Sequence, residues 1–119
     1  MEMEKLTEEQ LWHLIENANW STDHDYERIS KEYSKLTNSE FEQLDKFVLD
    51  KCGELADKYN KDWLGYPGID VSDDGWSDLR AEVVGRGKEF YENITVKKLQ
   101  EMADTNDFHE NFQYCLQRN

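Results

Sequence analysis

Along most of the chain, apolar residues recur at steps of three and four positions, the spacing of one face of an α-helix. Thr7 opens a Thr-Glu-Glu-Gln sequence, and this capping-box pattern predicts the start of a first helix. A second helix is expected after residues 21–23, and Ser39-Glu-Phe-Glu predicts the start of the longest one. The apolar positions of these three helices are Leu11, Leu14, Ile15 and Ala18, then Tyr26, Ile29, Tyr33 and Leu36, then Phe41, Leu44, Val48, Cys52, Leu55 and Tyr59.

Between residues 61 and 75 the helical period is lost, and Tyr-Pro-Gly and Asp-Asp-Gly are turn signals. The period resumes near Trp76 and continues to Ile94, with Gly85 and Gly87 inside it. Because glycine costs about 1 kcal/mol in a helix interior, we expect a bend there or the close approach of another backbone. Two short helices are predicted within residues 95–118, the first with Val96, Leu99 and Met102 and the second with Phe108, Phe112, Cys115 and Leu116.

These patterns together predict an all-α fold, a single-domain helical bundle of five to six helices over residues 1–119 with one long ordered loop. A chain of 119 residues has the usual length of one domain. The mean hydropathy is low at −0.99, but four Trp, six Tyr and five Phe supply large apolar side chains for a core. We therefore expect the chain to fold rather than to be disordered.

Acidic residues outnumber basic ones by 27 to 14, which gives a net charge of −13. Such a surface repels the phosphates of nucleic acid and attracts a basic protein partner. Solubility alone is the competing explanation, because charge of this kind is common in cytoplasmic proteins. The first ten residues lack the pattern of a signal peptide, no segment has the length of a membrane span, and Cys52 and Cys115 have no CxxC partner. These features predict a cytoplasmic protein with reduced thiols and no membrane partner.

The segment from residue 70 to residue 78 carries most of the candidate chemistry. Five of its residues occupy the first, third, fifth, sixth and ninth positions of a calcium-binding EF-hand loop, namely Asp70, Ser72, Asp74, Gly75 and Asp78. The twelfth position should supply two glutamate oxygens, but here it is Ala81. The preferred interpretation is a helix start, with Asp73 or Asp74 as the N-cap and Asp78 in the first turn. Calcium or small-ligand binding by this loop is the alternative.

The stretch "SDDGWSDLRAEVVGRGKEFY" resembles the signature of a bacterial family, domain of unknown function 4240. "LWHLIENAN" and "SEFEQLDKFVLDKCGELADKY" resemble its opening and middle helices, so that the likeness covers residues 6–91. The resemblance implies a helical fold and no established catalytic residues. Glu82 stands where the family typically has Trp, which indicates a position facing solvent or a partner. The residues that match the signature are Ser72, Asp73, Asp74, Gly75, Arg80, Gly87 and Tyr91, while Trp76 and Leu79 replace its aromatic residues.

The sequence offers little support for catalysis. His13, His24 and His109 are far apart, no phosphate-binding glycine loop is present, and no cofactor or metal site is predicted. On the longest helix, Glu54 and Lys58 are expected to form a solvated i,i+4 pair. We therefore expect a non-enzymatic interaction protein, most specifically an immunity protein or antitoxin that neutralises a basic toxin such as a nuclease. Its predicted partner-binding residues are Trp63, Tyr66, Asp70, Asp73, Asp74, Trp76, Asp78, Arg80 and Glu82.

Overall fold

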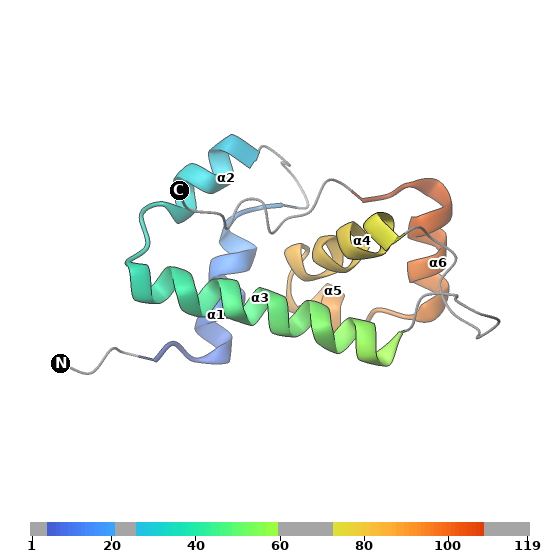
Figure 1. Ribbon diagram of the computed structural model, residues 1–119, viewed down its shortest axis with the longest axis horizontal. Coiled ribbons are helices and arrows are strands. Elements are labelled where there is room, and N and C mark those ends of the chain that lie inside the picture. The colour runs from blue at the N-terminus through green and yellow to red at the C-terminus, as the bar shows by residue number, and fades with distance from the viewer. Residues whose placement is uncertain (1–4, 21–25, 60–72, 109–119) are drawn as a thin grey trace.

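The computed structural model describes residues 5–20, 26–59 and 73–108. Within these ranges the chain forms six helices and no strand, which confirms the predicted all-α fold. In Figure 1 the long helix α3 runs along the molecule, with α1 and α2 toward one of its ends and α4, α5 and α6 toward the other. The helices are α1 (Glu8–Asn17), α2 (Tyr26–Tyr33), α3 (Asn38–Lys58), α4 (Asp73–Gly85), α5 (Lys88–Glu92) and α6 (Val96–Thr105).

Capping boxes start α1 and α3. The Thr7 side chain accepts a hydrogen bond from the backbone N–H of Gln10, whose side chain accepts one from the Thr7 backbone. Thr37 and Glu40 make the same reciprocal pair at the start of α3. The prediction for α1 is confirmed. The prediction that Ser39 caps α3 is wrong, because Thr37 holds that position and Ser39 lies inside the first turn.

The predicted helix from Trp76 to Ile94 is two helices. α4 begins earlier than expected, at Asp73, and ends at Gly85. Gly87 has a φ of +106°, a conformation that only glycine adopts at low cost, and it is the N-cap of α5. The expected bend between the two glycines is therefore confirmed, although the group that approaches Gly87 is the side chain of Glu16 rather than a backbone.

The core collects one face of each helix around α3 and α4. Leu44, Leu79 and Leu99 are fully buried, and Val96 is exposed among the predicted apolar positions that the structure describes. α2 is attached through buried Ile29 and through Tyr33, whose hydroxyl donates a hydrogen bond to the Leu14 carbonyl at 3.1 Å. The predicted C-terminal helix from Phe108, including Cys115, falls almost wholly outside the described residues.

Among the helices that the structure describes, none combines the length and the apolar character that crossing a membrane requires.

Candidate functional site

The sequence-predicted interaction residues are only partly described by the structure. Trp63, Tyr66 and Asp70 lie outside the described residues. Asp73 and Asp74 are the first two residues of α4, so neither is the N-cap that was predicted from the sequence. Asp78 lies one turn further along α4 and is half-buried. These acids keep their place near a helix N-terminus, where negative charge is favourable.

Trp76 and Arg80 contact each other on α4, and Arg80 connects α4 to α3. Trp76 is buried, and the Arg80 guanidinium lies 5.3 Å from the centre of its ring. Arg80 also donates a hydrogen bond to the backbone carbonyl of Cys52 at 3.2 Å. Trp76 is therefore part of the core, and its predicted contact with a partner stays a prediction. The role of Arg80 visible here is to hold the two helices together.

Glu82 is the clearest departure from the sequence-based interpretation. Its residue surface is 1% exposed, so the expectation that it faces solvent or a partner is wrong. Its carboxylate accepts a hydrogen bond from Arg86 Nε at 2.9 Å, and Arg86 also pairs with Asp107 at 3.0 Å. Burial alone would lower the pKa of Arg86, but the hydrogen bonds to the two carboxylates outweigh it and raise that pKa. A charged partner on the next helical turn therefore makes burial of a glutamate tolerable.

The backbone of α4 argues against the EF-hand alternative. An EF-hand loop turns sharply at its sixth position before its exiting helix. Here the chain is already helical at Asp73, the fourth position of that match, and Gly75 lies inside the helix. Across the part of the chain that the structure describes, no group of three His, Cys, Asp or Glu residues is placed to hold a metal ion.

A cluster of charged and aromatic side chains instead joins α1, α3 and α5. At its centre is Lys51, whose side chain is only 15% exposed. Its ammonium lies 3.0 Å from Glu8 Oε1 and 3.1 Å from Glu54 Oε2. It also lies 5.3 Å from the centre of the Phe47 ring and 5.5 Å from that of Tyr91. We call Glu8, Phe47, Lys51, Glu54 and Tyr91 the Lys51 cluster.

Hydrogen bonding fixes the charge state of this cluster. Tyr91 donates its hydroxyl hydrogen to Glu54 Oε2 at 2.7 Å. That bond, more than the ion pair with Lys51, lowers the pKa of Glu54, while burial and the same bond raise the pKa of Tyr91. Burial would lower the pKa of Lys51, but the hydrogen bonds that its ammonium donates to Glu8 and Glu54 outweigh burial and raise that pKa. Near neutral pH Glu54 is therefore a carboxylate, Lys51 an ammonium and Tyr91 a neutral phenol.

The sequence reasoning did not find this cluster. It paired Glu54 with Lys58, whereas the structure pairs Glu54 with Lys51 and Tyr91. The usable signals were the match of Tyr91 to the family signature and the acids in the first turn of α1. Neither shows that α1, α3 and α5 meet, because their contacts span long stretches of sequence.

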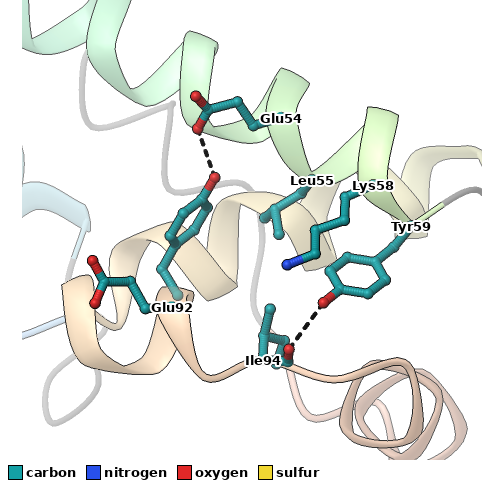
Figure 2. A pocket seen from close by; sticks show the side chains of 7 residues that line it. Glu54, Leu55, Lys58, Tyr59, Glu92 and Ile94 are labelled. Atoms are coloured by element: carbon teal, nitrogen blue, oxygen red, sulfur yellow. Dashed lines mark hydrogen bonds between the residues drawn. The ribbon is translucent and has the colours of Figure 1, made fainter.

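A cavity of about 240 Å³ lies beside the Lys51 cluster, between the second half of α3 and α5 (Figure 2). Apolar side chains of Leu55 and Ile94 and the rings of Tyr59 and Tyr91 line it. The Tyr59 hydroxyl donates a hydrogen bond to the Ile94 carbonyl at 3.1 Å, which fixes that ring against the connection between α5 and α6.

Three charged residues complete the lining of the cavity: Glu54, Glu92 and Lys58. The Glu54 bonds to Lys51 and Tyr91 both use Oε2, so that within the described residues Oε1 makes no hydrogen bond. Glu92 makes one long ion pair, 3.9 Å, with Lys88. The Lys58 side chain extends from α3 toward α5, with its ammonium 5.3 Å from the centre of the Tyr59 ring. The charged lining therefore sums to −1 at neutral pH.

Comparison with known families identifies the family of this chain. The model of a family described as a protein of unknown function, DUF4240, matches residues 6–116. The chain is a member of the DUF4240 family. The match continues through α6 and beyond, so the boundary at residue 91 drawn from the sequence was too short. No curated protein and no solved structure matches the chain significantly.

Three of the positions that matched the DUF4240 signature have structural roles in the described part of the chain. Arg80 bonds α4 to the carbonyl of Cys52, Gly87 provides the positive φ between α4 and α5, and Tyr91 bonds α5 to Glu54 on α3. These three residues position the helices around the cavity. These three signature residues thus contribute to the architecture of the site.

Proposed function

We propose that this DUF4240 protein is a non-enzymatic, cytoplasmic interaction protein, of the immunity-protein or antitoxin type, which neutralises a basic toxin such as a nuclease. One observation supports the proposal most directly. Four carboxylates in or beside the Lys51 cluster have side chains between 55% and 63% exposed, whereas the Lys51 side chain is 15% exposed. These acids are Glu8, Asp50, Glu54 and Glu92.

The same surface carries some positive charge. Lys46 pairs with Asp50 at 2.9 Å, and Lys88 lies near Glu92, so the local excess of acid is moderate. The net charge of −13 supplies the longer-range attraction. Together they suit a partner that carries a basic, nucleic-acid-binding surface.

The proposed mechanism has two stages. Long-range attraction between opposite charges first speeds the encounter, and this stage weakens as salt screens the charges. Carboxylates of this protein then pair with lysines and arginines of the toxin that would otherwise hold phosphates. The toxin loses its substrate site without any chemical step on the neutraliser. Rigid presentation of the acids, which the Lys51 cluster supplies to Glu8 and Glu54, reduces the entropy lost on binding.

Two surfaces are candidates for the contact: the segment with the sequence-predicted partner-binding acids Asp70, Asp73, Asp74 and Asp78, and the acids in or beside the Lys51 cluster. Two variants with the same change in net charge distinguish these surfaces. One replaces Asp70, Asp73, Asp74 and Asp78 by Asn, and the other replaces Glu8, Asp50, Glu54 and Glu92 by Gln or Asn. Each variant removes four negative charges. A difference in partner affinity between them at matched ionic strength therefore shows which surface contacts the partner, and it cannot result from net charge alone.

The experiment that tests the function starts with capture of partners from host lysate at low and high salt. A captured basic protein is then expressed alone and together with this protein, and growth and nuclease activity are measured. The proposal predicts growth arrest by the partner alone, rescue on co-expression, and inhibition at a one-to-one ratio. A partner that is acidic, or one whose activity continues at saturating concentrations of this protein, contradicts it.

A further inference from the structure

The cavity between α3 and α5 has the size of a site for one side chain. Pockets that hold drug-sized molecules and cofactors usually enclose about 300–1,000 Å³, and this cavity of about 240 Å³ is smaller. It is nevertheless larger than a single water molecule needs, about 30 Å³ of liquid. A nucleotide or coenzyme is therefore a poor fit, whereas one long amino-acid side chain is a good one.

The lining is suited to a cationic group on an apolar stem. Leu55 and Ile94 offer apolar contact to methylene groups, and the tyrosine rings offer π faces to a cation. Glu54 and Glu92 supply carboxylate oxygens, of which Glu54 Oε1 makes no hydrogen bond within the described residues. An anionic ligand is disfavoured, because it would be repelled by two carboxylates and attracted by only one ammonium.

The protein itself binds a cation with two of the same side chains. Lys51 is held 3.1 Å from Glu54 and 5.5 Å from the ring centre of Tyr91, and both of these residues also line the cavity. Lys58 similarly lies with its ammonium 5.3 Å from the ring centre of Tyr59. Lysine–tyrosine contacts thus occur on both aromatic walls without any partner present.

We propose that this cavity receives an arginine side chain of the basic partner, with its guanidinium against Glu54 and the tyrosine rings and with Glu92 at the edge of the cavity. This inference rests on the proposed function, because it names the contact that the partner makes. Arginine fits better than lysine, since its planar group stacks on aromatic rings and carries enough N–H donors for two carboxylates. Lys58 is the internal competitor, because its charge lies at the same wall and must move aside.

The direct test is an NMR titration of the ¹⁵N-labelled full-length protein with blocked arginine (N-acetyl-arginine amide). The matched probes are blocked lysine and blocked citrulline, which has nearly the shape of arginine but no charge. We expect saturable amide shifts at residues 54–59 and 91–95 with arginine, weaker ones with lysine and none with citrulline. Equal shifts with citrulline, or non-saturating shifts spread over all exposed acids, overturn the proposal.

Variants make the test specific. Glu92→Gln should weaken arginine binding about fivefold, the size of one exposed ion pair. Glu101→Gln is its control, because Glu101 is also 59% exposed and also makes one long ion pair, 3.6 Å, with a neighbouring lysine. Lys58→Met should strengthen binding about threefold by removing the competing charge. If the cavity has only a structural role, Lys58→Met should not strengthen arginine binding. Equal effects of Glu92→Gln and Glu101→Gln on arginine binding would contradict the proposal that the cavity is the binding site.

The two proposals fail in different ways. If a basic partner is captured and neutralised but Glu92→Gln and Glu101→Gln bind it equally well, the cavity assignment is wrong and the function stands. If blocked arginine binds in the cavity but no captured protein is neutralised, the assigned partner class is wrong although the cavity binds arginine.

Discussion

The side chain of Glu16 caps a helix that begins seventy-two residues later: its Oε2 accepts a hydrogen bond from the backbone N–H of Lys88 at 3.0 Å. A helix start has unpaired N–H groups and a partial positive charge, so a carboxylate is well placed there. The local N-cap, Gly87, has no side chain to do this. The end of α1 is thereby fixed to the start of α5, which carries Tyr91 and Glu92 into the site.

The first prediction concerns the glycine in this contact. Gly87→Ala should destabilise the protein by about 2 kcal/mol, because φ is +106° and a Cβ would lie 3.0 Å from Glu16 Cγ. Gly53→Ala is the matched control. It lies inside α3 with nothing within 4 Å of the added carbon, so it should stabilise by about 0.5–1 kcal/mol. Urea unfolding of both variants checks the opposite signs, and a stable Gly87→Ala protein would show that the backbone there is not constrained.

The second prediction concerns the buried ion pair of α4. Arg86→Met leaves the Glu82 carboxylate buried without its cation and should cost about 3–5 kcal/mol of unfolding free energy. The double variant Glu82→Leu/Arg86→Met removes both charges and should recover much of that loss. Lys88→Met, which breaks an exposed pair of 3.9 Å, should cost less than about 1 kcal/mol. If Arg86→Met and Lys88→Met lower the unfolding free energy equally, burial does not determine how much the Glu82–Arg86 ion pair contributes to stability.

The third prediction concerns the thiol beside Arg80. Burial raises the pKa of Cys52 to about 11, against the opposing effect of the Arg80 charge. The thiol is therefore protonated and covered at neutral pH, and it should be inert. In a Cys115→Ser variant at pH 7.5, a disulfide reagent such as DTNB should label Cys52 only as fast as the protein opens. Immediate stoichiometric labelling of the folded protein would contradict this burial.

Helical periodicity was sufficient to predict the fold class and most of the core. Leu44, Leu79 and Leu99 were assigned to buried faces, and each is buried. Errors occurred at the boundaries, where two capping residues compete within a few positions. Thr37 and Ser39 each begin a Thr/Ser-x-x-Glu sequence, and the sequence alone gives no reason to prefer Thr37 as the N-cap.

The site was harder to predict, because it depends on contacts between distant segments. Glu82 was taken for a surface residue because it stands where the DUF4240 signature typically has Trp. It is instead buried and pairs with Arg86, which in turn pairs with Asp107, 21 residues further along the chain. Lys51 has two acids within four residues on its own helix, yet its second ion pair is with Glu8 on α1. Such partners cannot be read from spacing on one helix.

The last prediction uses the hydrogen bond between Tyr91 and Glu54. That bond is the main cause of the lowered pKa of Glu54 in the folded protein. A carboxylate with a lowered folded pKa binds fewer protons when folded than when unfolded. Its contribution to stability is therefore full above the unfolded value near 4.3 and is lost as the pH falls through the lower folded value.

Tyr91→Phe removes the donor and should bring the pKa of Glu54 closer to its unfolded value. The variant should lose about 0.5–1 kcal/mol at pH 7, a modest amount because the Glu54 carboxylate is more than half exposed. The deficit should shrink between pH 5 and pH 3, since wild type loses the contribution there too. Tyr59→Phe is the control, because its hydroxyl bonds to the Ile94 carbonyl, which does not titrate. Urea unfolding at several pH values should show a deficit that is constant for Tyr59→Phe and decreases on acidification for Tyr91→Phe; parallel curves would mean that the Glu54 charge contributes nothing.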